Sequence, residues 1–458
     1  MAQKPSIPKG TRDFSPSEVA KRNYIFDVVK KHFQTFGFQP IETPSFENSE
    51  TLLGKYGEEG DRLIFKILNS GDYLAKVRDE TYTAKNSTSL TSKISEKALR
   101  YDLTVPFARY VVMHQNEIDF PFKRYQIQPV WRADRPQKGR FREFFQCDAD
   151  VVGSDSLLQE IELVQLYDAV FTDLKLTGTT IKLNNRKILA GIAEVIGAKE
   201  RLIDFTVALD KLDKIGVAGI TKEMLDKGIS EAAIEKAKPL FSLSGTNTEQ
   251  LQVLGELLKD SEEGTKGVAE LTFIITAVEK LGLQSANLTI DVTLARGLNY
   301  YTGAIFEVGA PSGVQMGSIG GGGRYDNLTG IFGLKDVSGV GISFGLDRIY
   351  LVLEDLHLFP EAIDQALEVL CVNFGEKEAF AALQLVTNLR KKGVKADVYP
   401  SSAKMQKQMK YANKRNVPYV ILIGEQEVSD GTFVVKNMQK GEQQTYKLAN
   451  VSDFLDAL

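Results

Sequence analysis

The 458-residue sequence is poor in histidine and cysteine. It contains His32, His114 and His357, and two cysteines, Cys147 and Cys371. Neither set has the close spacing of zinc ligands, and histidines this scattered do not suggest a Ser-His-Asp triad. The distant cysteines form no disulfide framework and fit a reducing compartment. The sequence therefore predicts chemistry based on arginine, carboxylate and tyrosine side chains, with no metal site assigned to protein side chains.

The sequence also lacks the long apolar segments of a membrane protein. No run approaches the roughly 20 apolar residues that a membrane-spanning helix needs, and the N-terminus has no apolar core of a secretory signal. We therefore expect a cytoplasmic protein with no membrane partner. Because the net charge is −4, any contact with nucleic acid is expected to come from local basic patches.

The chain is long enough for more than one domain. Strands and helices are mixed over residues 1–360, and helix follows helix in an insertion at about residues 186–282. After a break in composition near residues 360–365, strands and helices alternate over residues 365–458, which predicts a smaller α/β domain.

A basic stretch, "RADRPQKGRFREFFQ", lies between two strand-like segments, residues 123–132 and 141–153, so it forms the tip of a predicted hairpin. Five cations lie before Glu143: Arg132, Arg135, Lys138, Arg140 and Arg142. Arginine forks bind phosphate oxygens bidentately. The tip is therefore a candidate site for a triphosphate or RNA, and a solvated charged turn is the alternative.

The strand that follows this tip has a polar face. Alternation places Gln146, Asp148 and Asp150 on one side and Phe145 and Cys147 on the other. The polar side is thus expected to continue the candidate site along the sheet.

A second basic stretch lies near the C-terminus, where nine cations and one acid occur between Arg390 and Arg415. Four lysines recur along one face of a predicted helix: Lys404, Lys407, Lys410 and Lys414. Met405, Met409 and Ala412 are predicted on its buried side. Contact with a phosphate backbone and a solvated helix face both remain open.

Several stretches together resemble the class II aminoacyl-tRNA synthetases. "GFQPIETPSFE" resembles motif 1, "VWRADRPQKGRFREFFQ" motif 2 and "GVGISFGLDR" motif 3. "RGLNYYTG" and "GGGGRYDNL" are similar to signatures of the histidyl-tRNA synthetase family, and "RYDLTVPFARY" also fits. The resemblance implies an α+β catalytic domain built on an antiparallel sheet with a helical insertion. It also implies a C-terminal α/β anticodon-binding domain and a homodimer formed through residues 17–47.

The resemblance also implies an activity, ATP-dependent activation of L-histidine to histidyl-adenylate and its transfer to the 3′ end of tRNA(His). ATP is then a substrate, and Mg²⁺ is expected with it. The implied catalytic residues are Arg132, Arg296 and Arg348. The implied ATP contacts are Arg132, Arg140, Glu143, Arg296 and Arg348. The implied histidine contacts are Asp102, Thr104 and Gln146 for the amino group, and Asp150, Tyr300 and Tyr301 for the imidazole. The expected tRNA contacts are Lys404, Lys407, Lys410 and Lys414.

Two alternatives use the same core without catalysis: a regulator of histidine biosynthesis and a tRNA sensor. The regulator lacks the anticodon domain and departs from the "RGLNYY" signature. This chain has the signature and the region expected to form the anticodon domain. A sensor is expected to lose the phosphate-binding arginines, and Arg132, Arg296 and Arg348 are all present. The sequence therefore favours the enzyme.

Overall fold

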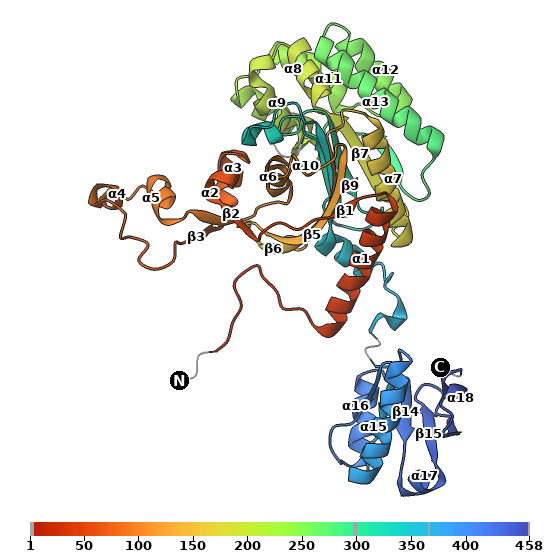
Figure 1. Cartoon of the computed structure of the whole chain (residues 1–458). Coiled ribbons are helices and arrows are strands. Elements are labelled where there is room, and N and C mark those ends of the chain that lie inside the picture. Colours follow the sequence, from red (N-terminus) through yellow and green to blue (C-terminus); the bar gives the residue numbers. More distant parts are fainter. Residues whose placement is uncertain (1–3, 296–299, 365–366, 457–458) are drawn as a thin grey trace. The chain divides into compact units, whose positions relative to one another are not determined.

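The computed structural model describes residues 4–295, 300–364 and 367–456. The chain divides into two compact units (Figure 1). The first contains Met1–Asp13 and Arg22–Leu358, and the second contains Phe14–Lys21 and Phe359–Leu458. In the part of the chain described, no helix is long and apolar enough to cross a membrane.

An eight-stranded sheet forms the centre of the first unit, in the order β1-β5-β6-β11-β10-β9-β7-β8. In that order the strands are Gln39–Pro40, Phe122–Trp131, Glu143–Val152, Gly339–Gly345, Gly320–Arg324, Ala304–Gly309, Thr180–Asn185 and Asn287–Ile290. Neighbours from β5 to β7 are antiparallel, whereas the edge pairs β1–β5 and β7–β8 are parallel. The antiparallel sheet is thus confirmed for its central strands, with parallel edges added.

The helices α1 (Pro16–Thr35) and α7 (Leu158–Asp173) cover one face of this sheet. In α1, Phe33 is buried and its ring centroid lies 5.8 Å from that of Phe344 in β11. In α7, the rings of Tyr167 and Phe171 lie 4.8 and 5.6 Å from Phe344. Because side chains alternate along a strand, the side chain of Ser343 points to the opposite face.

Six α-helices between β7 and β8 form the predicted helical insertion. They are α8 (Arg186–Val195), α9 (Leu202–Leu209), α10 (Leu212–Asp226), α11 (Glu231–Phe241), α12 (Asn247–Leu258) and α13 (Glu262–Leu281), with the short η1 (Lys199–Arg201). The helices α8 and α13 cross at two glycines. A Cβ on Gly191 would lie 2.4 Å from the Cα of Gly264, so a side chain there would push the helices apart.

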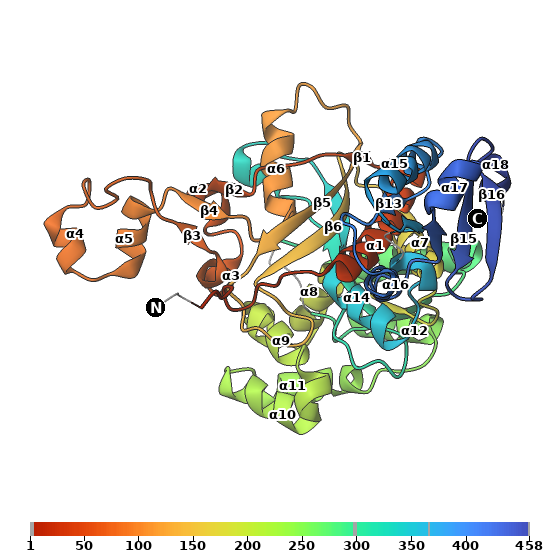
Figure 2. The same cartoon turned by 90° about the horizontal axis from the view of Figure 1, so that it is seen from below.

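A small three-stranded sheet, β2-β4-β3, carries an arm that extends from the rest of the first unit (Figure 2). Its elements are β2 (Phe46–Asn48), α2 (Ser49–Leu52), α3 (Gly57–Leu63), β3 (Lys66–Ile67), α4 (Asp79–Thr83), α5 (Ser87–Ile94) and β4 (Lys97–Leu99). The remaining elements of this unit are α6 (Thr104–Met113), η2 (Thr329–Phe332) and α14 (Leu346–Asp355).

The second unit has a five-stranded sheet in the order β13-β12-β14-β15-β16, with β12 parallel to β13 and β14. Its elements are η3 (Glu361–Asp364), β12 (Val369–Cys371), α15 (Glu376–Lys391), β13 (Ala396–Val398), α16 (Met405–Lys414), β14 (Tyr419–Leu422), α17 (Glu425–Asp430), β15 (Thr432–Asn437), β16 (Gln443–Lys447) and α18 (Ser452–Leu455). The predicted α/β architecture of this region is therefore confirmed.

The helix α16 differs from its predicted amphipathic pattern at one position. Met405 is 43% exposed, so the prediction that it is buried is wrong. Met405 is the first residue of the helix, and Gln408 takes the buried position instead. The Gln408 amide accepts from Asn373 N at 2.9 Å and donates to Asn373 O at 2.8 Å. These bonds satisfy a polar side chain that lies on the buried face by helical periodicity, although its polarity alone would assign it to solvent.

Candidate active site

A cleft of about 750 Å³ opens on the large sheet of the first unit. Five of the predicted site residues line it: Arg132, Arg140, Gln146, Tyr301 and Arg348. Of the predicted histidine and ATP contacts that are described, five lie outside its lining: Asp102, Thr104, Glu143, Asp150 and Tyr300. Arg296 lies outside the described residues. The predicted residues thus divide into a group at the cleft surface and a group outside it.

Arg132 follows directly after β5 and is held at the cleft wall by its neighbours. Its Nε donates to Tyr101 O at 3.0 Å. Its guanidinium carbon lies 4.3 Å from the centroid of the Tyr101 ring and 5.2 Å from that of Phe144. These contacts orient the fork before a ligand binds, which is the geometry that bidentate anion recognition requires.

Arg348 enters the cleft from the first turn of α14. Its Nε donates to Gly139 O at 3.0 Å and its Nη1 donates to Ser318 O at 2.5 Å. Burial lowers the pKa of Arg348, and the nearby Arg140 and Arg132 lower this pKa further. The three cations therefore repel one another across the cleft, and an anionic ligand would relieve that repulsion.

Asp102 lies behind the cleft wall at 1% exposure. Tyr56, which lines the cleft, donates its hydroxyl to Asp102 Oδ1 at 2.8 Å. The hydroxyl of Tyr300 donates to Asp102 Oδ2 at 3.2 Å and also contacts the side chain of Thr104. Burial raises the pKa of Asp102, and the bond from Tyr56 opposes that rise. Asp102 is therefore connected to the cleft through Tyr56, and Tyr300 links Asp102 to Thr104 behind the cleft wall.

Asp150 is 3% exposed and has polar partners inside the fold. The Tyr325 hydroxyl donates to Asp150 Oδ1 at 2.5 Å, and Arg124 Nη2 lies 2.8 Å from Asp150 Oδ2. Gly341 of β11 makes room for this carboxylate, because a Cβ there would lie 1.9 Å from Asp150 Oδ1. Asp150 also contributes to raising the pKa of Tyr301, which burial raises most. Asp150 thus acts electrostatically on the cleft-lining Tyr301.

The sequence reasoning did not assign roles to Arg124 and Tyr325. Arg124 is fully buried, with its guanidinium carbon 4.2 Å from the centroid of the Phe107 ring. The sequence did contain a signal for Arg124. This arginine lies in a strand that also carries buried polar residues, and a buried charge is rare without a partner. Tyr325 lies in the quoted "GGGGRYDNL" stretch, but its partner Asp150 is 175 residues away.

Gln146 forms the polar floor of the cleft with Arg132 at its wall, and the buried Asp148 lies behind Gln146 as its hydrogen-bond acceptor. Gln146 Nε2 donates to Ser343 Oγ at 3.3 Å and to Asp148 Oδ1 at 3.4 Å. Gln146 Oε1 is buried and has no hydrogen-bond donor among the described residues. Burial raises the pKa of Asp148 from 3.8 to about 7, and Arg124 opposes this rise. The floor is therefore rich in acceptors and suits a cationic donor such as an ammonium group.

Replacing Asp148 with asparagine is expected to remove a pH-dependent part of the stability. Because the folded-state pKa is raised, the protonated carboxyl favours folding, and this contribution is lost as pH rises from about 4 to about 7. We expect the stability of Asp148→Asn relative to the parent to increase by roughly 1–3 kcal/mol between pH 5 and pH 8. Urea unfolding followed by the fluorescence of the single tryptophan, Trp131, measures this difference. An equal difference at both pH values would contradict the prediction.

Glu143 and the lysines of α16 are solvent-facing. Glu143 is exposed and accepts from Trp131 Nε1 at 2.7 Å, across the β5–β6 pair. The four predicted tRNA contacts are all exposed in the second unit: Lys404, Lys407, Lys410 and Lys414.

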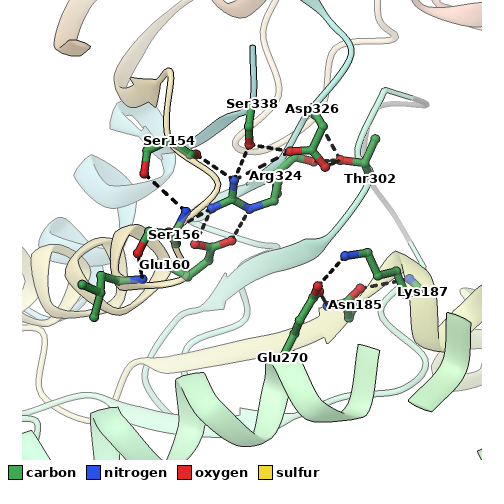
Figure 3. Close-up of polar contacts among 11 residues, drawn as sticks. Ser154, Ser156, Glu160, Asn185, Lys187, Glu270, Thr302, Arg324, Asp326 and Ser338 are labelled. Carbon is green, nitrogen blue, oxygen red and sulfur yellow. Dashed lines mark hydrogen bonds and ion pairs between the residues drawn. The ribbon is translucent and has the colours of Figure 1, made fainter. Parts of the chain in front are cut away.

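A buried polar network holds the strand ends that carry Tyr301 and Tyr325 (Figure 3). Arg324 donates to Glu160 at 2.5 and 2.7 Å. Its Nη1 also donates to Ser338 Oγ at 2.5 Å. Thr302 N donates to Arg324 O at 2.8 Å, and Thr302 Oγ1 donates to Asp326 at 2.6 Å. The network joins the residues next to both tyrosines to α7.

A second contact secures the same segment from the insertion side. Arg186 N donates to Gly303 O at 2.8 Å. The adjacent Lys187 and Asn185 both donate to Glu270 of α13, as Figure 3 shows. The chain after Tyr301 is therefore fixed on two sides, which gives a cleft-lining side chain a rigid base.

Comparison with known proteins places this geometry in a family. A model described as "Histidyl-tRNA synthetase" matches residues 10–85 and 93–349, and one described as "Anticodon binding domain" matches residues 368–458. A histidine–tRNA ligase of Christiangramia forsetii is 68% identical over 455 residues, 99% of this chain and 100% of the relative. One from Bacteroides fragilis is 59% identical over the full length of both chains.

Solved structures agree with these matches. The histidyl-tRNA synthetase from Nostoc sp. PCC 7120 aligns with a TM-score of 0.82 at 29% identity and covers 100% of both chains. Because the family model spans most of the chain and the relatives match it from end to end, the chain belongs to the histidyl-tRNA synthetase family.

Proposed function

We propose that this protein activates L-histidine with ATP and transfers the histidyl group to the 3′ end of tRNA(His). The observation that carries the proposal is the division of the cleft into two chemically different parts. Three arginines form a cationic wall: Arg132, Arg140 and Arg348. The other part is a polar floor with a buried acceptor on Gln146 and the carboxylate of Asp148 next to it. A triphosphate suits the wall, and an α-ammonium group suits the floor.

In the first step, a carboxylate oxygen of histidine attacks the α-phosphorus of ATP. A new O–P bond forms, the bond to the β-phosphate oxygen breaks, and pyrophosphate leaves. This reaction needs orientation and compensation of charge on the phosphoryl oxygens, rather than a protein nucleophile. Arg132 and Arg348 serve these purposes from the described cleft, and the resemblance adds Arg296 from the opposite side of the phosphate. Arg140 and Glu143 are the further proposed ATP contacts.

In the second step, a hydroxyl of the terminal ribose of tRNA attacks the carbonyl carbon of histidyl-adenylate. The ester bond forms, AMP leaves with the electrons of the C–O bond that breaks, and the hydroxyl proton is released with it. The lysines of α16 are exposed along one helix and are proposed to contact the phosphate backbone of the tRNA.

The amino acid is proposed to lie over the polar floor. Gln146 and Tyr301 line the cleft and contact histidine directly. On the amino-group side, Asp102 acts through the cleft-lining Tyr56, and Thr104 supports it through Tyr300, whose hydroxyl bonds to Asp102. On the imidazole side, Asp150 is proposed to orient and polarise Tyr301, whose pKa it helps to raise.

Three finer features complete the proposal. Mg²⁺ would arrive with ATP and be held by its phosphate oxygens, because the described residues contain no group of three or more carboxylate, cysteine or histidine side chains that could hold the ion. The protein would work as a cytoplasmic homodimer joined through residues 17–47. Sedimentation of a fully active monomer at micromolar concentration would exclude the dimer.

Amino-acid-dependent exchange of pyrophosphate with ATP, run with each of the twenty amino acids, tests the function. We expect exchange with histidine alone, followed by charging of tRNA(His) when tRNA is added. A folded protein that exchanges with no amino acid would support the regulator or sensor instead. The 68% and 59% identical relatives, both histidine–tRNA ligases, favour the enzyme.

Replacing the four lysines of α16 with alanine is expected to weaken tRNA charging while leaving exchange intact. Each phosphate contact that is lost should reduce the magnitude of the slope of log K against log salt concentration by roughly 0.7–0.9, where K is the association constant for tRNA. The measurement is tRNA affinity between about 50 and 200 mM salt, with exchange as the internal reference. A variant with the exposed Lys377, Lys440 and Lys447 replaced is the matched control in the same unit. Equal losses in both variants would contradict a specific role for α16.

A further inference from the structure

A short N-terminal segment, residues 8–13, packs against the loop between β5 and β6. We call this segment the strap. Arg142 N donates to Gly10 O at 2.8 Å, and Arg142 Nη1 donates to Lys9 O at 3.4 Å. Gly10 has a φ of +89°, and a Cβ there would lie 2.8 Å from Arg142 Cγ and 2.9 Å from Pro136 Cγ. The strap backbone is therefore in tight contact with both sides of the loop.

One side chain of the strap extends this contact to two elements of the cleft. The guanidinium carbon of Arg12 lies 3.3 Å from the centroid of the Phe141 ring, and its Nη2 lies 2.6 Å from Asp347 Oδ1. Phe141 and Asp347 both line the cleft. Phe141 directly follows Arg140, and Asp347 directly precedes Arg348. Arg12 therefore contacts Phe141, the residue after Arg140, and Asp347, the residue before Arg348.

The loop is fixed at a second place, on the other side of Arg140. Arg348 Nε donates to Gly139 O at 3.0 Å. The strap holds Phe141 and Arg142, so Arg140 is enclosed between two anchored points of the backbone. Arg22 of α1 also pairs with Asp347 Oδ1, at 2.6 Å, which secures Asp347 itself.

From these contacts we propose that Arg12 is a positioning residue for ATP. It holds the loop of residues 132–142 against α14 and thereby sets the separation of Arg140 and Arg348 before the nucleotide binds. This inference rests on the proposed function, because it concerns the same cleft. The physical reason is that Arg140 lies on a hairpin tip, where an unanchored loop would have to be ordered at the expense of binding free energy.

The proposal predicts an effect on ATP that is separable from any effect on histidine. Gln146 lies in β6, and Tyr301 lies in the segment that Arg324 holds. Among the described residues, no hydrogen bond joins either side chain to the strap. We expect Arg12→Ala to raise the KM for ATP by about tenfold, which corresponds to about 1.4 kcal/mol, and the KM for histidine by less than about twofold. Arg12→Lys keeps a cation for Asp347 and is expected to recover part of the loss.

Pyrophosphate-exchange kinetics on the full chain provide the first measurement, with Lys9→Ala as the control. Lys9 is the exposed strap cation, and only its backbone oxygen contacts the loop. Gly10→Ala is a second test, because its Cβ would push Arg142 and Pro136 away, and it should also raise the KM for ATP. Equal increases of the KM for ATP and for histidine in Arg12→Ala would overturn the proposal, as would an unchanged KM for ATP.

Amide hydrogen exchange of residues 135–142 provides the second measurement and does not depend on activity. We expect faster exchange in Arg12→Ala than in Lys9→Ala, with ATP restoring protection only at higher concentration. Unchanged protection would reject the positioning role. If the parent showed no histidine-dependent exchange of pyrophosphate, the proposed function would fail, and hydrogen exchange would still decide whether Arg12 anchors the loop.

Discussion

Replacing Arg132 with alanine is expected to slow histidyl-adenylate formation by about 10²–10³-fold. Arg132 lines the cleft, and its Nε is already bound to Tyr101 O at 3.0 Å. Such a pre-oriented donor stabilises charge that develops on the α-phosphoryl oxygens without reorganisation at the moment of reaction. Single-turnover formation of the adenylate, with ATP and histidine saturating, measures the effect.

Two variants distinguish this role from a general effect of charge. Arg132→Lys keeps the charge and loses the planar fork, so its rate should lie between those of the parent and the alanine variant. Arg135 lies three residues further along the same loop, is exposed and is outside the cleft lining. In the absence of tRNA, Arg135→Ala should stay within about twofold of the parent. A loss below about fivefold for Arg132→Ala, or about 1 kcal/mol, would remove it from the catalytic group.

Local periodicity predicted the part of the site that lies on one hairpin. The alternation that placed Gln146, Asp148 and Asp150 on one face agrees with the register, where they face Gln128, Gln126 and Arg124 of β5. The basic tip indeed contributes Arg132 and Arg140 to the cleft. These features depend on neighbours within about 30 residues, so strand period and turn composition were sufficient.

Long-range packing decided the features that the sequence did not predict. The room for Asp150 comes from Gly341 on the adjacent strand β11, and its hydroxyl donor comes from Tyr325. Asp102 is screened from the cleft by Tyr56 of the arm. A strand pattern assigns each side chain to a face but not to a depth, because depth depends on which residues the neighbouring strands supply. In α16, the helical pattern likewise did not predict that Gln408 is buried while Met405 is exposed.

Replacing Arg324 with methionine is expected to destabilise the first unit by about 3–5 kcal/mol. The Arg324 and Glu160 side chains are 5% and 0% exposed and make two bonds at 2.5 and 2.7 Å. Removing the arginine leaves the Glu160 carboxylate buried without its cation, and the desolvation cost is then uncompensated. Urea unfolding followed by Trp131 fluorescence reports on this unit, because Trp131 is the single tryptophan and lies in β5.

A double variant separates the buried charge from the lost volume. Arg324→Met combined with Glu160→Leu removes both charges, so it should recover much of the stability that either single change loses. Lys199→Met serves as the matched control, since Lys199 and Glu194 pair at 2.9 Å on the surface of the same unit. That exposed pair is expected to contribute little. If the losses in unfolding free energy of the two single variants add up to the loss of the double variant, the ion pair itself is not the source of the effect.

The same substitution should also raise the KM for histidine under conditions where the protein is still folded. Arg324 O accepts from Thr302 N at 2.8 Å, which fixes the residue after Tyr301. Tyr325 follows Arg324 directly, and its hydroxyl donates to Asp150 at 2.5 Å. Loss of the ion pair therefore loosens the cleft-lining Tyr301 and the neighbouring Tyr325, on the side proposed to bind the imidazole, while Arg132 and Arg348 belong to other elements. A larger increase in the KM for histidine than in the KM for ATP is the expected result, the reverse of the pattern for Arg12→Ala.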